Sequence, residues 1–132
     1  MKLRSVNVAG LTQVLHQGDL IQTGIFKRPV AGPVSVDTLQ MDGDRQADLL
    51  NHGGADKAVY GYPWEHYSRW AAELARDDFE PGQFGENLTT EGLLEAELAI
   101  GDRLRIGTVL LEVSQPRVPC FKLNLRMKSP AF

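Results

Sequence analysis

The sequence of 132 residues contains a single cysteine, which excludes an internal disulfide framework, and no Cys/His cluster has the spacing of a zinc site. It also lacks any apolar run long enough to span a membrane. Residues 1–8 are too few and too polar for the core of a signal peptide. The net charge of −3 argues against a general nucleic-acid binder, whose surface would be basic. We therefore expect a cytoplasmic protein with no membrane or nucleic-acid partner.

What the sequence does contain is an ordinary globular composition, 42% hydrophobic and 23% charged, which suits one domain over residues 1–132. Thirteen glycines and seven prolines are spread along it, a distribution typical of many short strands and turns. The clearest hairpin joins 103–106 to 109–113 through the two-residue turn at 107–108. We expect further strands at residues 3–8, 21–26, 34–37, 47–50 and 58–62.

One segment, residues 63–76, has helical periodicity instead. Its apolar side chains recur every three or four residues, which places them on one face of a helix: Trp64, Tyr67, Trp70, Ala71 and Leu74. We interpret this face as core packing rather than as a cofactor-stacking surface. Short strands with one amphipathic helix predict a mainly β domain, either a barrel or a closed sandwich.

The only cysteine, Cys120, lies between Arg117 and Lys122 and close to Pro116 and Pro119. A thiol acts as a nucleophile or a metal ligand in its thiolate form, which nearby cations favour. The prolines fix φ and remove backbone donors, so they favour a stiff, irregular loop over a helix or a central strand. Such a thiol is a candidate nucleophile or metal ligand. The alternative is a small buried apolar residue without reactivity.

A second candidate segment contains consecutive glycines, Gly53 and Gly54, whose backbone N–H groups can form a nest for an anion. Asn51, His52 and Lys57 add an amide donor, a titratable ring and a cation within seven residues. The alternative is a plain turn between strands, with His52 and Lys57 solvated.

Two further segments carry polar groups of interest. Asn87, within the glycine-containing residues 82–92, can offer amide donors and acceptors to a heterocycle; alternatively, it braces its own loop. The glycines there do not follow a strand and open a βαβ unit, which excludes a dinucleotide fingerprint. Lys27 and Arg28 follow an expected strand and can bind phosphate, with ordinary surface solvation as the alternative.

Taken together, residues 26–30, 51–60, 84–88 and 116–123 resemble the MOSC domain, the module named for the C-terminal part of molybdenum cofactor sulfurases. The sequence is most similar to the bacterial YiiM-type branch, which resembles reductases of N-hydroxylated purines. This resemblance implies a closed β-barrel related to the pyruvate-kinase barrel and binding of a molybdopterin-type molybdenum cofactor. It also implies that a C-terminal helical region, thought to help electron delivery or partner docking in YiiM-type proteins, is absent here.

By this resemblance Cys120 is the molybdenum ligand or a sulfur carrier, and His52 is a proton donor near the metal. The expected activity is reduction of N-hydroxylated purines or related compounds, in a detoxification role. The expected partners are the small N-hydroxylated substrate and an electron-donating reductase. The residues expected to bind the cofactor are Lys27, Arg28, Asn51, Gly53, Gly54, Asp56, Lys57, Asn87, Arg117 and Lys122.

Two alternative functions stay open at this point. A sulfur- or cofactor-carrier module would bind the molybdenum cofactor or a persulfide without turnover of its own. A weaker alternative is a phosphate pocket with a structural cysteine that holds pyridoxal phosphate on Lys27 or Lys57. Isolated lysines are mostly solvated, which disfavours this last reading.

Overall fold

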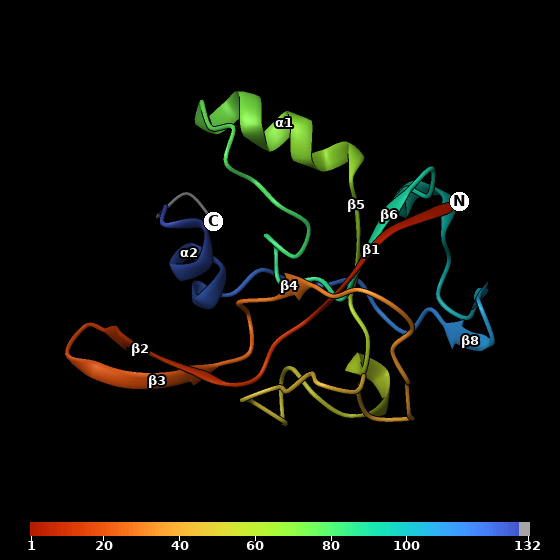
Figure 1. Ribbon diagram of the computed structural model, residues 1–132, viewed down its shortest axis with the longest axis horizontal. Helices are drawn as coiled ribbons and strands as arrows, with labels where there is room; N and C mark the ends of the chain where they lie inside the picture. The colour runs from red at the N-terminus through yellow and green to blue at the C-terminus, as the bar shows by residue number, and fades with distance from the viewer. Residues whose placement is uncertain (130–132) are drawn as a thin grey trace.

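The computed structural model describes residues 1–129, so the end of the predicted domain, residues 130–132, lies outside the described part. Figure 1 shows the elements in chain order from the red N-terminus to the blue C-terminus. Strands outnumber helices within residues 1–129, in agreement with a mainly β domain. The elements are β1 (Lys2–Val8), β2 (Thr12–His16), β3 (Asp19–Thr23), β4 (Arg28–Pro29), η1 (Ala55–Lys57), β5 (Gly61–Pro63), α1 (Glu65–Leu74), β6 (Leu88–Glu91), η2 (Glu95–Glu97), β7 (Arg103–Ile106), β8 (Val109–Glu112) and α2 (Phe121–Met127).

The central sheet has the strand order β4-β1-β6-β5. Strand β1 runs antiparallel to β4 and β6, whereas β5 runs parallel to β6. The register between β1 and β6 shifts between Leu3 and Ser5, as at a β-bulge, which locally increases strand twist. Strand β6 lies between β1 and β5 in this sheet. The segment that leads into it therefore lies in the interior, and residues 82–87 are buried.

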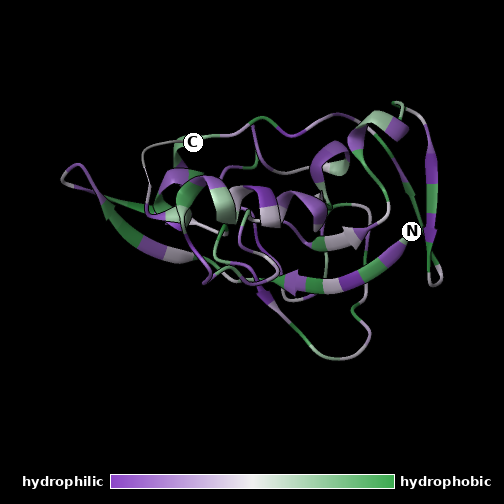
Figure 2. Cartoon of the chain, turned by 90° about the horizontal axis from the view of Figure 1, so that it is seen from above, coloured by the Kyte–Doolittle hydropathy of each residue, from purple (hydrophilic) through white to green (hydrophobic). Residues whose placement is uncertain are grey.

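Two hairpins, β2–β3 and β7–β8, form separate two-stranded sheets. They lie at opposite ends of the molecule, as both Figure 1 and the view from above in Figure 2 show. A barrel requires hydrogen bonding that continues around all of its strands, whereas these hairpins pair only within themselves. Within residues 1–129 no sheet closes on itself, so the expected closed barrel is not confirmed.

The hairpin predicted late in the chain is confirmed as β7–β8, with Ile106 opposite Val109 across the turn. The first predicted strand is confirmed as β1. The segments 21–26 and 58–62 are strands only at one end, where β3 and β5 overlap them. Strands β2, β4 and β6 were not predicted.

The strands predicted at 34–37 and 47–50 are wrong, apart from one isolated bridge at Val36. Each segment contains an aspartate whose carboxylate accepts hydrogen bonds from the N–H groups two and three residues later. The distances are 2.8 Å for both bonds at Asp37 and 3.2 and 3.1 Å at Asp48. These side chains hold the backbone in turns and so compete with strand pairing.

The predicted amphipathic helix is confirmed as α1. Its Tyr67 is 3% exposed and forms a core cluster with Phe84 and Met127, against which Trp64 and Trp70 pack. The rings of Tyr67 and Trp64 stack at a centroid distance of 4.3 Å. The aromatic face of α1 is therefore core, as interpreted. Neither α1 nor α2 has the length and apolar character that crossing a membrane would demand, and the same holds for the other described helices.

Candidate functional site

Two adjoining cavities meet at the segment that carries Cys120. The small cavity has a volume of about 50 Å³, and the large cavity has a volume of about 700 Å³. The large cavity lies between the central sheet and the β7–β8 hairpin, and apolar side chains such as Leu104 and Leu111 line it. The residues that line both cavities are His52, Lys57, Tyr60, Arg117 and Cys120.

The small cavity brings together predicted site residues from four separate segments. Lys27 lies between β3 and β4, His52 and Lys57 lie in the loop and short helix before β5, and Asn87 immediately precedes β6. The fourth segment runs from the loop after β8 into the first turn of α2. The predicted site residues that line this cavity are Lys27, His52, Lys57, Asn87, Arg117, Cys120 and Lys122. The structure thus provides the convergence that the sequence could not demonstrate.

Other predicted site residues lie elsewhere. Asn51 and Asp56 line the large cavity only. Arg28 is exposed on β4 and is not among the residues that line either cavity. The same holds for Gly53 and Gly54, although Gly54, at φ +90°, does adopt the left-handed conformation that favours glycine.

Cys120 is partly exposed and lies at the point where a loop becomes a helix. It is the N-cap residue of α2, with an extended backbone at φ −129° and ψ 171°, and its carbonyl accepts a hydrogen bond from the N–H of Leu123 at 2.9 Å. The irregular loop predicted from the prolines therefore ends at Cys120, and a helix follows directly. Arg117, in this loop, places its guanidinium 5.0 Å from the ring centroid of Tyr60.

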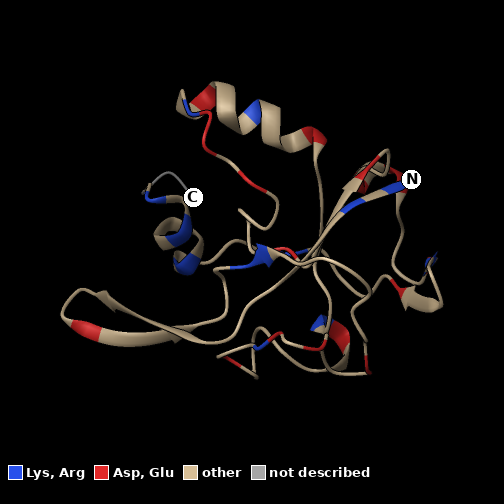
Figure 3. Cartoon of the chain, viewed as in Figure 1, with Lys and Arg blue, Asp and Glu red and all other residues tan. Residues whose placement is uncertain are grey.

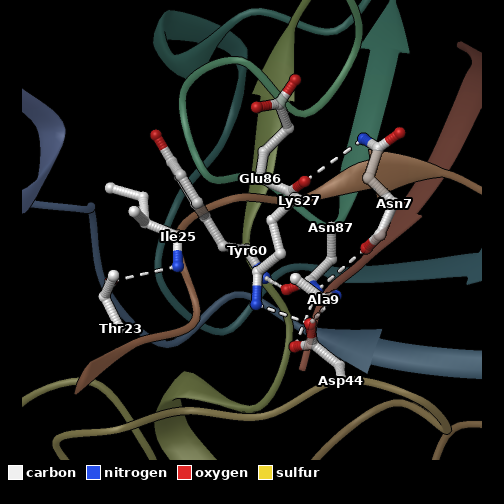
Figure 4. Close-up of polar contacts among 9 residues, drawn as sticks. All are labelled: Asn7, Ala9, Thr23, Ile25, Lys27, Asp44, Tyr60, Glu86 and Asn87. Carbon is white, nitrogen blue, oxygen red and sulfur yellow. Dashed lines mark hydrogen bonds and ion pairs between the residues drawn. The ribbon is translucent and has the colours of Figure 1, made fainter. Parts of the chain in front are cut away.

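A buried ion pair that sequence reasoning missed forms the inner wall of the small cavity. The ammonium of Lys27 donates to Asp44 Oδ1 at 2.5 Å, and the two residues are 5% and 1% exposed (Figure 4). Burial lowers the pKa of Lys27, the Asp44 carboxylate opposes this effect, and the positive charge of Arg117 lowers the pKa further. The N–H of Ala9 donates to the same carboxylate oxygen at 3.0 Å.

Asn87 uses most of its amide inside the protein. Its Nδ2 donates to Asp44 Oδ2 at 3.0 Å and to the carbonyl of Asn7 at 3.2 Å, while its Oδ1 accepts the N–H of Tyr60 at 3.0 Å (Figure 4). An asparagine amide offers two donors and two acceptor positions, so one acceptor position is left. These contacts favour a structural role for Asn87, in which it braces its own loop, over hydrogen bonding to a heterocycle.

A second buried carboxylate, Glu86, shapes the loop that carries Asn87. It is 0% exposed and accepts hydrogen bonds from the N–H groups of Gly82 and Phe84, at 3.0 and 3.1 Å, and from the hydroxyl of Tyr67. Burial raises the pKa of Glu86, and these hydrogen bonds oppose the rise. Glu86 belongs to a stretch that carried the family resemblance, but no sequence pattern distinguished it from a solvated glutamate.

His52 is half-buried beside a positive field. Burial is the largest cause that lowers its pKa, and the charges of Arg117 and Lys122 lower it further, whereas Asp48 opposes the shift. The imidazole is therefore mainly neutral at pH 7. The same cations that depress its protonation attract an anion to the small cavity.

The arrangement suits a thiolate-ligated, phosphorylated group rather than a metal held by protein alone. Among the described residues no group of three His, Cys, Asp or Glu side chains could hold a metal ion. The small cavity instead presents one thiol, from Cys120, and cations from four segments of the chain, beside the carboxylates of Asp44 and Asp48; the cations are Lys27, Arg45, Lys57, Arg117 and Lys122. Such a site offers a single soft ligand together with countercharge for a phosphate.

Comparisons with known proteins agree with this geometry. The model of the MOSC domain family matches residues 48–132. YflK of Bacillus subtilis, described as uncharacterized, is 46% identical over 119 residues, which is 90% of this chain and 53% of that protein. YiiM of Escherichia coli is 45% identical over 104 residues, 77% of this chain and 46% of that protein. A Gibberella moniliformis protein named Reductase is 42% identical over 116 residues, 86% of this chain and 20% of that protein.

The crystal structure of YiiM from Geobacillus stearothermophilus matches with a TM-score of 0.76 and 37% identity, over 98% of this chain and 57% of that chain. The mainly β fold with few helices is therefore shared with a solved YiiM structure. The chain spans about half the length of the YflK and YiiM relatives it matches. On the strength of the family match, the YiiM relatives and the converged site, the chain belongs to the MOSC family, as a member of its YiiM-type branch.

Proposed function

We propose that this chain is a molybdenum-cofactor-binding domain that reduces N-hydroxylated purines or related compounds, with Cys120 as the protein ligand of molybdenum. The observation that carries the proposal is that Cys120 lines one cavity with Lys27, Lys57, Arg117 and Lys122. Membership of a family associated with the molybdenum cofactor supports the choice of cofactor. A relative named Reductase supports the reductive direction.

The residues present fit such a cofactor. Molybdenum accepts soft thiolate ligands, and the protein offers one thiolate, so the remaining ligands must come from the cofactor itself. Lys57, Arg117 and Lys122 supply countercharge for the phosphate of the pterin. The small cavity, at about 50 Å³, has room for only part of such a molecule, and the adjoining large cavity, at about 700 Å³, has room for the rest and for a substrate.

Each residue then has a defined role. When bound, the cofactor supplies the two-electron redox chemistry. Asp44 holds the Lys27 ammonium at the inner wall, and Asn87 keeps the neighbouring loops in place. His52 is the proton donor: because burial and nearby cations lower its pKa, its protonated form is a stronger acid than an ordinary imidazolium. The proton goes to the oxygen that leaves as water.

The cellular setting and the partners are part of the same proposal. We propose a cytoplasmic, single-domain module that acts on small N-hydroxylated compounds in detoxification and receives electrons from a separate reductase. In the alternative function, a sulfur- or cofactor-carrier module, the same site binds its cargo but the chain does not catalyse the reduction. It is favoured by one observation, that Cys120 is partly exposed and so accessible to a sulfur donor.

The test is a reductase assay on protein purified from a host that makes the cofactor. We expect conversion of 6-N-hydroxylaminopurine to adenine with reduced benzyl viologen as the chemical electron source, followed by chromatography. Cys120→Ser should abolish the conversion, whereas Arg105→Gln, at an exposed position on β7, should leave it unchanged. No conversion by molybdenum-loaded protein, together with a persulfide on Cys120 detected by mass spectrometry, would favour the carrier.

A further inference from the structure

Positive charge is concentrated at the end of this acidic chain. Residues 113–132 contain four basic residues and no Asp or Glu, for a net charge of +4. Residues 1–112 contain ten basic and seventeen acidic residues, for a net charge of −7. Figure 3 shows that helix α2 carries basic but no acidic residues, and that the basic β4 lies near it. The proposed cofactor site accounts for Arg117 and Lys122 but not for the other cations here.

Three of these cations, together with Arg28 on β4, lie on or beside α2. Lys122 and Arg126 are four residues apart and share a helix face. Lys128 follows as the C-cap residue, and Arg28 on β4 is close enough for its charge to act on Arg126. We call Arg28, Lys122, Arg126 and Lys128 the α2 basic surface. Arg28, which lines neither cavity, therefore belongs to this surface.

The α2 basic surface contains unfavourable interactions when no partner is bound to it. Burial is the largest cause that lowers the pKa of Arg126, and the like charge of Arg28 lowers it further, against the opposing carboxylates of Glu86 and Glu80. The Nε of Arg126 is buried and has no hydrogen-bond partner among the described residues. A buried donor without a partner and two adjacent like charges both cost free energy. An acidic surface placed here would relieve the repulsion between Arg28 and Arg126.

The α2 basic surface is continuous with the Cys120 site. Cys120 is the N-cap residue of α2, and Lys122 lines the small cavity beside it. Two apolar side chains flank the cysteine and are exposed, Val118 at 73% and Phe121 at 46%. Exposed apolar side chains surrounded by charge are the usual composition of a protein-binding surface, with an apolar centre and a charged rim.

We propose that the α2 basic surface, with Val118 and Phe121, docks an acidic protein electron donor that carries a flavin. This inference rests on the proposed function, because reduction of R–NHOH to R–NH₂ and water consumes two electrons and two protons. The N–O bond breaks, its oxygen leaves in water, and the donor is oxidised by two electrons. The chain contains one cysteine and hence no dithiol that could supply them. Docking beside Cys120 brings the donor to the site that uses the electrons.

The test is a binding titration of the full chain with flavodoxin, a small acidic flavin protein, followed by isothermal titration calorimetry. Opposite charges attract more weakly at higher ionic strength, so Kd should rise about tenfold between 25 and 200 mM NaCl. The double charge reversal R28E/K128E should raise Kd about tenfold or more at 25 mM NaCl. The matched control R103E/R105E makes the same change in net charge on exposed positions of β7, and it should alter Kd less than about twofold.

Equal effects of the two double variants, or no binding by the wild-type chain, would overturn the proposal. Both variants are checked for wild-type circular dichroism. If R28E/K128E does not fold, R28Q/K128Q replaces it, with an expected rise in Kd of about threefold. The titration requires neither molybdenum nor turnover. Failure of docking and failure of the proposed reductase activity are therefore separate results.

Discussion

Replacing Asp44 by Asn removes the negative charge that holds the inner wall of the small cavity. The carboxylate accepts hydrogen bonds from Lys27, Ala9 and Asn87 at 2.5, 3.0 and 3.0 Å, and both members of its ion pair with Lys27 are buried. The substitution keeps the shape but leaves the Lys27 ammonium without its counter-charge. Removing one partner of a buried ion pair costs about 3–5 kcal/mol. Since domains of this size are stable by about 5–15 kcal/mol, we expect Tm to fall on the order of 10–20 °C.

Urea unfolding followed by circular dichroism measures this loss, with Glu112→Gln as the control. Glu112 pairs with Arg103 at 3.5 Å on the surface, and both side chains are more than half exposed, so breaking this pair should cost at most about 1 kcal/mol. Adding Lys27→Met to Asp44→Asn removes the uncompensated charge and should restore part of the loss. The reasoning is refuted if Asp44→Asn costs no more than Glu112→Gln, or if Lys27→Met has the same effect in both backgrounds.

The loss caused by Asp44→Asn should also depend on pH. Burial lowers the pKa of Lys27 in the folded protein, so the unfolded chain binds more protons in the window below the ordinary lysine value of 10.5. Stability therefore rises as the pH increases through that window, because the neutral amine needs no counter-charge. The deficit of Asp44→Asn relative to wild type should shrink between pH 7 and pH 10. A constant or growing deficit would contradict a charged, buried Lys27.

Two further predictions concern Arg117 and Gly82. Arg117→Gln should raise the pKa of His52, measured by NMR titration of the imidazole, because after burial the Arg117 charge is the largest cause that lowers it. Arg103→Gln should not, and an unchanged pKa in Arg117→Gln would contradict the placement. Gly82→Ala should cost about 2 kcal/mol or more, measured by urea unfolding, because φ is +88° and the added Cβ would lie 2.7 Å from a backbone carbonyl oxygen. Gly107→Ala, at φ +58° in open space, should cost about 1 kcal/mol, and equal losses would refute the role of the close contact.

Locally encoded elements could be predicted from the sequence, and elements that depend on distant partners could not. The alternation and glycine turn at 103–112 and the aromatic spacing in α1 are local patterns, and both predictions are confirmed. Strand β6 is a strand because β1 and β5 pair with it across the chain, and no pattern within it records those partners. At 47–50 a strand was predicted, but the side chain of Asp48 holds a turn there.

The same distinction explains which parts of the site were predictable. The cations and the thiol around Cys120 occur in short, unusual runs, so their segments could be found in the sequence. Asp44 and Glu86 are single acidic residues without a surrounding motif. The role of Asp44 arises when the end of β1 and the loop before β6 meet it, and Glu86 depends in part on Tyr67, which α1 supplies. Asn87 was found, but its contacts with Asp44 and Asn7 are long-range and turn a candidate ligand-binding residue into a brace.

The most direct test of the account is the molybdenum and pterin content of the chain purified from a host that makes the cofactor. We expect about one molybdenum and one pterin per wild-type chain and little molybdenum in Cys120→Ser, because the protein has no second thiol. Arg105→Gln, purified in parallel, should match the wild type. No molybdenum in the wild-type chain, under conditions that load a known molybdoenzyme, or equal content in Cys120→Ser, would contradict ligation by Cys120.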